Sequence, residues 1–412
     1  MTYKQALDYL YSQLPMYQRQ GKKAFKKDLK NIKSLCKYFD DPQDTYPTIH
    51  IAGTNGKGTV AHMLSAVFQQ AGLRVGLYTS PHYKDFRERI KINGEYIPKR
   101  KVSSFTSKVK QQIESLRPSF FEITVAMAFQ HFKNEKVDIA IIETGLGGRL
   151  DSTNIITPRL SIITNISLDH QSMLGNTLTK IAKEKAGIIK EKVSVVIGEK
   201  QKATTKVFAN VAKKRGSKIY FAEDIVDDSK GNKGSTPLQN PYETMNARTV
   251  RAALAIWNEE KLGIRINKKT ISQGIASYRS ISNYLGRWQI LSKAPLVIAD
   301  SAHNEGGVSL LVNHLLCFYE PSRMHFVIGF VKDKPLARVL NILPKEARYY
   351  FCQAKIPRAL PADSLKQEAS SFGLVGESFM QTHNAFRAAK RNVATKDIVI
   401  VCGSIFVVAE VI

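Results

Sequence analysis

The sequence predicts an α/β protein of two domains, each built on a mostly parallel sheet with helices on both faces. Three observations support this prediction. Short apolar runs alternate with helical patterns along most of the chain, as in sheets whose strands are joined by crossover helices. With 412 residues, the chain is too long for one ordinary hydrophobic core. The stretch 51–59, IAGTNGKGT, places three glycines between a predicted strand and a predicted helix.

The first domain is predicted over residues 1–284. Two helices precede a strand at 48–51, and another helix follows the glycine-rich turn. The Asn93-Gly94 pair between alternating apolar residues is a strong signal for a β-hairpin. Further strands are expected at 73–78, 137–142, 160–164 and 193–197, and helices at 101–116, 122–134 and 246–261. The turn-rich stretch 231–243 is interpreted as a loop of this domain.

A smaller, Rossmann-like α/β domain is predicted over residues 285–412, where a new series of strands and helices begins. Its strands are expected at 296–299, 325–329, 349–352 and 398–401, and its helices at 306–319, 335–342, 363–372 and 384–391. Because strands and helices alternate again, this sheet is also expected to be doubly wound.

The composition excludes several classes of protein. Hydrophobic residues make up 43% and charged residues 23% of the chain, as in a soluble globular protein. No apolar run approaches the roughly 20 residues of a membrane span, and the amphipathic N-terminus does not resemble a signal peptide. Four widely spaced cysteines without a C-x-x-C pair favour a reducing cytosol over a zinc ribbon or a disulfide framework. We therefore expect a cytoplasmic protein without a membrane partner.

The net charge is the most unusual feature of the composition. The chain carries 61 basic and 35 acidic residues, a formal excess of +26. Such an excess attracts nucleic acid or polyanionic small molecules, and it also serves solubility. The densest basic stretch, 21–33, carries apolar residues at helical spacing and predicts an amphipathic helix with a basic outer face. Because the basic residues do not form one block interleaved with aromatic residues, we expect no nucleic-acid partner.

The glycine-rich stretch predicts an ATP site. A glycine-rich turn lets backbone N–H groups converge on an anion, and a helix N-terminus adds about half a positive charge. Lys57 is placed to reach the β- and γ-phosphates, and the Thr59 hydroxyl to ligate Mg²⁺. Gly58 separates these two residues, so the stretch is a variant of the strict G-x-x-x-x-G-K-[ST] pattern, and a turn with an incidental lysine is the alternative. The residues expected around the nucleotide are Gly53, Thr54, Asn55, Gly56, Lys57, Gly58 and Thr59.

Polar residues follow three predicted strands at the sheet edge where ligands collect in open α/β sheets. They are Ser80, Glu143, and the pair Asp169 and His170. Hydroxyl and carboxylate oxygens suit Mg²⁺, whereas histidine is a less usual partner. Taken alone, His170 is more typical of a hydrogen-bonded structural residue. Together with the P-loop threonine, the set predicts a magnesium site.

Two further groups are candidates for the same chemistry. Lys185 lies in IAKEKAGIIK and belongs either to a solvated helix face or to an active cleft, where burial readily changes the reactivity of an amine; the sequence leaves both open. In the second domain, the segment 300–304 (DSAHN) ends a predicted strand and opens a helix, and Arg287 is suited to a bidentate phosphate contact. A ligand in a cleft between the domains would meet both sets.

Long motifs in a fixed order resemble those of folylpolyglutamate synthases and dihydrofolate synthases. They are IAGTNGKGTV, TSPH, RERIKING, FFEIT, ETGLGGRLDSTN, ITNISLDH and EKAGIIK, followed by GR at 286–287 and by the segment 300–304. VCGSIFVVAEV at 401–411 resembles the C-terminal strand and helix of that family. The family belongs to the ATP-dependent amide ligases related to the Mur ligases of peptidoglycan synthesis.

The resemblance implies an ATP-dependent ligase that adds L-glutamate to tetrahydrofolate. ATP phosphorylates a folate carboxylate to an acyl phosphate, the amine of glutamate attacks it, and ADP and phosphate are released. A Mur ligase central-type ATP-binding domain is implied for 1–284, and a C-terminal glutamate-ligase domain for 285–412. The expected partners are the small molecules ATP, folate and L-glutamate, and we expect a monomer.

The resemblance also implies roles for individual residues. Lys57 belongs to the ATP-binding motif as a catalytic residue. Lys185 matches the lysine that is carbamylated in relatives, where the carbamate helps to hold the metal. The family's magnesium positions match Ser80, Glu143 and His170, beside Thr59 of the P-loop; its nucleotide contacts match Asn246, Arg287 and Asp300; and its glutamate-side positions match His303, taken as catalytic, and Ser404.

Two residues depart from the family pattern. Ser301 stands where relatives usually have the glycine of D-G-A-H-N. If that position requires a positive φ, the serine is strained by about 1 kcal/mol; if not, the change is neutral. Tyr83 stands where relatives usually have leucine after S-P-H, close to the expected place of the folate.

Three alternatives to a folylpolyglutamate synthase follow from these features. A dedicated or bifunctional dihydrofolate synthase would use dihydropteroate as the acceptor, although FRERIKINGEYI is more similar to the polyglutamate-adding members. A Mur-type ligase acting on a UDP-sugar peptide is less favoured, because the chain opens directly on the ATP domain. A nucleic-acid-binding P-loop protein is the alternative that the net charge suggests.

Overall fold

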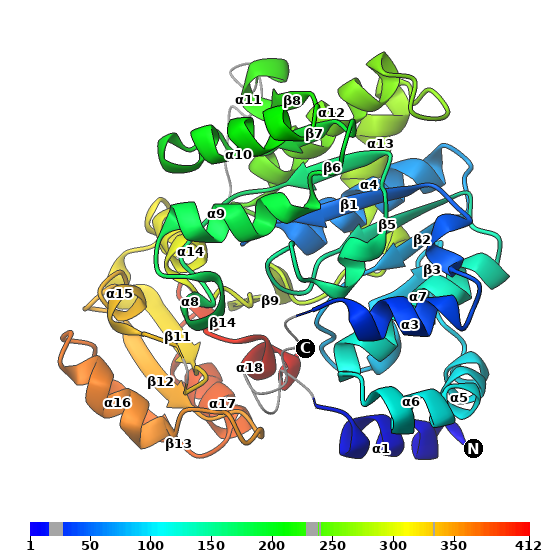
Figure 1. Ribbon diagram of the computed structural model, residues 1–412. Coiled ribbons are helices and arrows are strands. Elements are labelled where there is room, and N and C mark those ends of the chain that lie inside the picture. The colour runs from blue at the N-terminus through cyan, green and yellow to red at the C-terminus, as the bar shows by residue number, and fades with distance from the viewer. Residues whose placement is uncertain (16–27, 228–237, 239, 333) are drawn as a thin grey trace. The chain divides into compact units, whose positions relative to one another are not determined.

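The protein divides into two compact units, which are described separately (Figure 1). The computed structural model describes residues 1–15, 28–227, 238, 240–332 and 334–412. The first unit comprises residues 1–230 and 244–284, and the second 231–243 and 285–412. Both contain mainly parallel sheets, which confirms the predicted α/β class. No helix in the described part of the chain is long and apolar enough to cross a membrane.

Within the described residues, the first unit holds an eight-stranded sheet in the order β4-β3-β2-β5-β1-β6-β7-β8, with β3 and β4 antiparallel to the strands beside them. The strands are β1 Thr48–Ala52, β2 Val75–Tyr78, β3 Ile90–Ile92, β4 Glu95–Tyr96, β5 Ile139–Glu143, β6 Leu160–Ile163, β7 Val195–Ile197 and β8 Ile219–Phe221. The helices are α1 Tyr3–Gln13, α3 Lys30–Lys37, α4 Lys57–Gln70, α5 Lys99–Lys108, α6 Lys110–Leu116, α7 Phe120–Asn134, α8 Gln171–Leu174, α9 Leu178–Lys185, α10 Lys202–Lys214, α11 Ala222–Ile225, α12 Glu243–Glu259 and α13 Lys268–Ile281.

Alternation along the central strands assigns each face of this sheet to different helices. Ile139 and Ile141 of β5 pack into the core formed with α4, α12 and α13, whereas Ala140 and Ile142 pack into the core formed with α3, α5 and α7. Because successive strand residues point to opposite faces, Glu143 at the end of β5 belongs to the α4 face. The apolar runs read from the sequence are therefore strands buried on both sides.

The second unit, within its described residues, holds a six-stranded sheet in the order β13-β12-β11-β14-β10-β9, in which β9 is antiparallel. Its strands are β9 Gln289–Lys293, β10 Leu296–Ala299, β11 Met324–Ile328, β12 Arg348–Cys352, β13 Gly376–Phe379 and β14 Ile398–Cys402. Its helices are α14 Glu305–Leu316, α15 Ala337–Leu340, α16 Ala362–Ser370, α17 Thr382–Asn392 and α18 Ile405–Ala409. Residues of α14, α15 and α16 share its main core with β10, β11 and β14.

The structure differs from the sequence-based description in two places. Residues 240–243, which fall inside the range 1–284 given to the first domain, lie in the second unit; there the Tyr242 hydroxyl donates to the Gly307 carbonyl at 2.8 Å. The strands β8, β9 and β13 were not anticipated, because their residues are mostly half-buried and form no continuous apolar run. The predicted helix within 21–33 lies partly outside the described residues, and α3 begins at Lys30.

The Asn93-Gly94 hairpin is confirmed. Asn93 has φ +49° and Gly94 has φ +80°, the pair of positive values that a type I′ turn between β3 and β4 requires.

Candidate active site

The glycine-rich turn after β1 lies where the sheet reverses its strand order. β1 pairs with β5 on one side and β6 on the other, and ligands of open α/β sheets bind outside the carboxyl ends of strands at such a point. Gly53 has φ +149° and Gly56 has φ +83°. A Cβ atom on Gly53 would overlap the Thr164 hydroxyl. The turn therefore needs glycine for its backbone angles and for its close approach to β6.

The segment after β6 fixes the shape of this turn. The Thr164 hydroxyl donates to the Asn55 carbonyl at 2.6 Å, and the Asn55 amide donates to Asn165 Oδ1 at 3.1 Å. The Ser167 amide donates to Thr54 Oγ1 at 3.0 Å. The Thr54 amide donates to the Asn165 carbonyl. The amides of Thr54 and Asn55, which we expected to face the nucleotide, therefore hold the turn itself.

The N-terminus of α4 is the candidate anion site. Its N-cap residue is Gly56, and no side chain among the described residues caps the helix. The first N–H groups of a helix have no intrahelical acceptor, so those of Lys57, Gly58 and Thr59 are turned toward the end of α4. Uncapped donors together with the helix dipole attract phosphate.

Lys185 is buried beside the P-loop, which excludes the solvated helix face as its environment. Its side chain is 4% exposed, and its Nζ donates to the Gly53 carbonyl at 2.6 Å. Burial lowers the pKa of Lys185 to about 7, with a further lowering by Lys57 and an opposing effect of Asp169. Lys57 itself donates to the Thr54 carbonyl at 3.3 Å. An amine with this pKa is substantially neutral near pH 7 and is therefore a nucleophile.

Two motifs meet around Lys185 and hold it in place. The Arg149 amide donates to the Glu184 carbonyl at 2.8 Å, and Asn154 Nδ2 donates to the Gly187 carbonyl at 3.0 Å. Because the glycine-rich loop after β5 packs on the end of α9, GGRLDSTN and EKAGIIK form one structural element.

The predicted metal ligands are partly brought together. The Glu143 carboxylate accepts the Ser80 amide at 3.0 Å, and a Cβ on Gly58 would lie 3.7 Å from both of its oxygens. His170 has φ +49°, and its Nε2 lies 3.9 Å from Asp169 Oδ1. The described residues contain no group of three or more histidine, cysteine or acidic side chains arranged for a metal. A cation here would depend on the Glu143 carboxylate together with hydroxyl ligands and phosphate oxygens.

Two residues of the 244–284 segment complete the surroundings of the P-loop. Asn246 on α12 lies against Gly56, where a Cβ atom would collide with its side-chain amide. The Tyr284 hydroxyl lies 2.6 Å from the Thr59 hydroxyl. Asn246 was expected in this place, whereas nothing in the sequence pattern singled out Tyr284.

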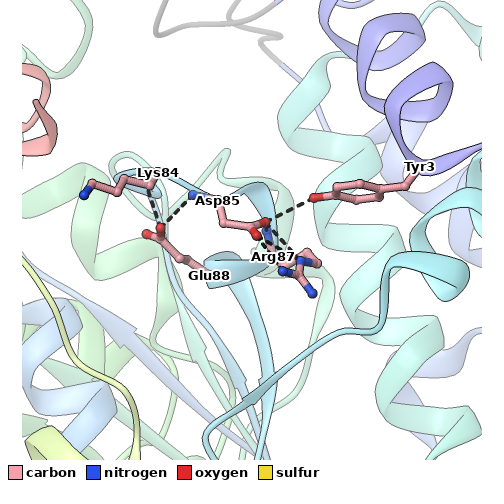
Figure 2. A network of polar contacts seen from close by, with 5 residues as sticks. All are labelled: Tyr3, Lys84, Asp85, Arg87 and Glu88. Atoms are coloured by element: carbon pink, nitrogen blue, oxygen red, sulfur yellow. Dashed lines mark hydrogen bonds and ion pairs between the residues drawn. The ribbon is translucent and has the colours of Figure 1, made fainter.

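The loop that follows Ser80 is organised by one buried carboxylate (Figure 2). Glu88 accepts the backbone amides of Tyr83, Lys84 and Asp85 at 2.7, 2.9 and 2.7 Å. Figure 2 also shows Asp85 between Arg87 and Tyr3 of α1. Tyr83 is thus held by its backbone in a defined loop, and Glu88 is a positioning residue that motif reading missed.

In the second unit, the 300–304 segment lies beside the turn after β14. Asp300 is buried, and its carboxylate accepts the amides of Trp288 at 2.7 Å and Ala302 at 2.8 Å. His303 Nδ1 lies 2.8 Å from the Ser301 carbonyl. The Gly403 amide donates to the Ala302 carbonyl at 2.8 Å, which joins the two loops. The carboxylate of Asp300 therefore holds backbone, in addition to any role toward a nucleotide.

Both polar residues that open helices in this region are N-caps. Asn304 accepts the Gly307 amide at 2.9 Å at the start of α14, and Ser404 accepts the Val407 amide at 3.2 Å at the start of α18.

Ser301 does not adopt a positive φ, and its hydroxyl donates to the Gly286 carbonyl at 3.1 Å. The serine is therefore unstrained, which excludes the strained alternative.

Family models match most of the chain. Residues 51–235 match the Mur ligase middle domain, and residues 286–405 match the Mur ligase, glutamate ligase domain. The chain is 32% identical over 373 residues to the dihydrofolate synthase/folylpolyglutamate synthase of Escherichia coli, covering 88% of this chain and 85% of that protein. It is 31% identical over 439 residues to the folylpolyglutamate synthase of Lacticaseibacillus casei, covering 100% and 98%.

Another relative, from Haloferax volcanii, is a probable bifunctional folylpolyglutamate synthase/dihydropteroate synthase, 29% identical over 439 residues, and the chain spans 50% of its length. Solved structures show the same fold. E. coli FolC in complex with DHPP and ADP has a TM-score of 0.83 at 29% identity, covering 100% of this chain and 97% of that one. A Yersinia pestis bifunctional enzyme complexed with AMPPNP and Mn ion has a TM-score of 0.84 at 30% identity, with the same coverage.

Proposed function

Because the chain belongs to the folylpolyglutamate synthase/dihydrofolate synthase family of Mur-type ligases, we propose that it joins L-glutamate to tetrahydrofolate with conversion of ATP to ADP and phosphate. The γ-phosphoryl group passes to a folate carboxylate oxygen, which gives an acyl phosphate and releases ADP. The amine of glutamate then forms a bond to the carbonyl carbon, phosphate leaves, and the nitrogen loses a proton.

The observation that carries the proposal is the uncapped N-terminus of α4, whose first residue is Lys57. Gly56 leaves the first amides of the helix without a side-chain acceptor, and the amine of Lys57 donates to the Thr54 carbonyl of the same turn. Transfer of a phosphoryl group to a carboxylate brings two anions together, so such a site must concentrate positive charge.

The residues at this sheet edge fit a divalent cation. Glu143 supplies a carboxylate beside Gly58, and the proposed set includes Thr59, Ser80 and His170. Bound Mg²⁺ supplies charge that offsets the phosphates during transfer. The chemistry of oxygen donors suits Mg²⁺, and the Mn-bound Yersinia pestis relative is consistent with a cation in this family.

Lys185 is proposed to be carbamylated. Its neutral amine forms a bond to the carbon of CO₂ and loses a proton, which leaves an anionic carbamate in place of a cation. The lowered pKa of Lys185, about 7, supports this step because the protonated amine is not a nucleophile. A carbamate would add oxygen ligands where the described side chains provide few acidic ones.

The second unit is proposed to serve glutamate and the nucleotide. His303 and Ser404 lie on loops that are joined by the bond from Gly403 to Ala302, and both belong to the glutamate side. Arg287 and Asp300 are proposed as nucleotide contacts.

All four cysteines are free, which suits the reducing cytosol. We propose a cytoplasmic monomer, which light scattering of the purified protein would test.

The test is ATP-dependent incorporation of labelled glutamate, with tetrahydrofolate and dihydropteroate offered separately. Incorporation with tetrahydrofolate alone is expected for a dedicated polyglutamate synthase. Incorporation with both would establish the bifunctional alternative, which the double names of the E. coli and Bacillus subtilis relatives favour. Incorporation with neither acceptor, from protein that binds ATP, would contradict the proposal and direct the assay to UDP-linked acceptors.

A further inference from the structure

Tyr284 is the last residue of the first unit before the chain passes to the second. Its Oη lies 2.6 Å from Oγ1 of Thr59, the buried third residue of α4. The ring is held on several sides: its centroid is 4.7 Å from that of His62 and 5.3 Å from that of Tyr278, and the Arg279 guanidinium carbon lies 5.4 Å from it. The hydroxyl is therefore presented to Thr59 by a fixed ring.

The turn before Tyr284 is fixed as well. Buried Lys91 on β3 donates to the carbonyls of Ser282 at 2.9 Å and Asn283 at 2.7 Å. His62 Nδ1 on α4 lies 2.7 Å from the Ser282 hydroxyl. These contacts connect the end of the first unit to the same helix that carries the anion site. The Thr59–Tyr284 hydrogen bond thus joins two rigid parts of one unit.

We propose that Tyr284 is a positioning residue for the metal–nucleotide complex: its oxygen accepts the Thr59 proton and so turns a lone pair of Thr59 Oγ1 toward the cation. This inference rests on the proposed function, in which Thr59 is a metal ligand. A hydroxyl that ligates a cation uses a lone pair of its oxygen, and its proton must find an acceptor elsewhere. The Tyr284 oxygen is at hydrogen-bonding distance for that proton.

Tyr284→Phe tests this inference, because it removes the hydroxyl and keeps the ring. The measurement is the dissociation constant of ADP by calorimetry, with Mn²⁺ or Mg²⁺ and with EDTA. We expect ADP to bind about three- to tenfold more weakly in the presence of metal, the size of one neutral hydrogen bond, and with unchanged affinity in EDTA. Tyr278→Phe, which removes a hydroxyl from the neighbouring ring, is the matched control and should leave both affinities unchanged.

A double-mutant cycle distinguishes action through Thr59 from a general structural effect. Thr59→Ala should itself reduce the metal-dependent part of the affinity, and Tyr284→Phe should add nothing in that background. An equal loss with and without metal, or an additive effect in the double variant, would overturn the inference and leave the proposed function standing. Absence of metal-dependent ADP binding by the unaltered protein would overturn both.

Discussion

The helix that follows the P-loop in the first unit and two helices that follow strand ends in the second differ in how their N-termini are capped. In the first unit, α4 opens with Gly56 and receives no side-chain cap. In the second, Asn304 caps α14 and Ser404 caps α18. A capped end satisfies its own amides and stabilises the fold, whereas an uncapped end leaves donors for an anion. The uncapped end of α4 therefore supports the proposed anion site, whereas the caps of α14 and α18 stabilise the second-unit loops.

Several cationic side chains are buried in the first unit. The first unit buries the cationic side chains of Arg89, Lys91 and Lys185, and burial is the main factor that lowers the pKa of each. In the second unit, the buried carboxylate of Asp300 accepts hydrogen bonds from two backbone amides. We therefore expect Lys57→Ala and Lys185→Ala to change activity more than stability, and Asp300→Ala to change stability more than activity.

Lys57→Ala should have the largest effect, a loss of at least about a hundredfold in kcat, because it removes the charge that we propose faces the transferred phosphoryl group. The free energy of unfolding should change little. The measurement is ADP release, together with urea denaturation. Lys202→Ala is the matched control, since Lys202 is also the first residue of a helix, α10, and is exposed. A near-normal rate in Lys57→Ala would contradict the P-loop assignment.

Lys185→Ala should lose about ten- to a hundredfold in activity and in Mg²⁺ affinity, the range seen when groups that support a metal are removed. Stability should not fall, because a buried amine with a lowered pKa is removed. Glutamate incorporation across a Mg²⁺ titration measures the first effect, and Lys183→Ala, exposed on the same helix, is the control. Full activity with unchanged magnesium dependence would exclude the carbamate role.

Asp300→Ala should lower the free energy of unfolding by about 3 kcal/mol, because two buried amides lose a charged acceptor. Asp300→Asn keeps one acceptor oxygen and should lose less. Urea denaturation of both variants measures the difference. If instead Asp300→Ala kept its stability and lost ATP affinity, the proposed contrast between the units would be reversed at this residue.

Lys91→Met should remove a pH dependence of the free energy of unfolding that arises from a buried amine in the first unit. The folded-state pKa of Lys91 is about 8, below its ordinary value of 10.5, so between these values the unfolded chain binds more protons. Stability of the unaltered protein should therefore rise relative to Lys91→Met by about 1 kcal/mol per pH unit across this interval. Below pH 8 the amine is charged in both states and the difference should level off. Parallel stability curves from pH 7 to 9.5 would contradict this expectation.

Ser301→Gly should have the smallest effect, a loss of about 1 kcal/mol, because one hydrogen bond to Gly286 is removed. Since Ser301 is not strained, restoring the glycine of the family should bring no gain in stability. Thermal unfolding measures the change in stability, and the KM for glutamate measures any change at the proposed glutamate site. A more stable glycine variant would show that the serine carries a cost which its backbone angle does not reveal.

Much of the fold and part of the site are encoded locally. Apolar runs placed the central strands, because a strand buried on both faces has few polar residues. The Asn93-Gly94 pair placed its hairpin, and the order of strand, three glycines and helix placed the turn with Lys57 that we propose as the anion site. Each of these depends on backbone angles or side-chain patterns within a few residues, which a sequence states directly.

Contacts between distant segments supplied the rest. The half-buried edge strands β8, β9 and β13 have no continuous apolar pattern of their own. The burial of Lys185, and with it the low pKa, arises because the loop after β5 and the P-loop close over α9. The pairing of Tyr284 with Thr59 spans 225 residues of chain. The sequence by itself determined the strands, the turn and the chemical groups; burial and partners arise only when remote segments pack together, because desolvation and hydrogen bonding depend on three-dimensional neighbours.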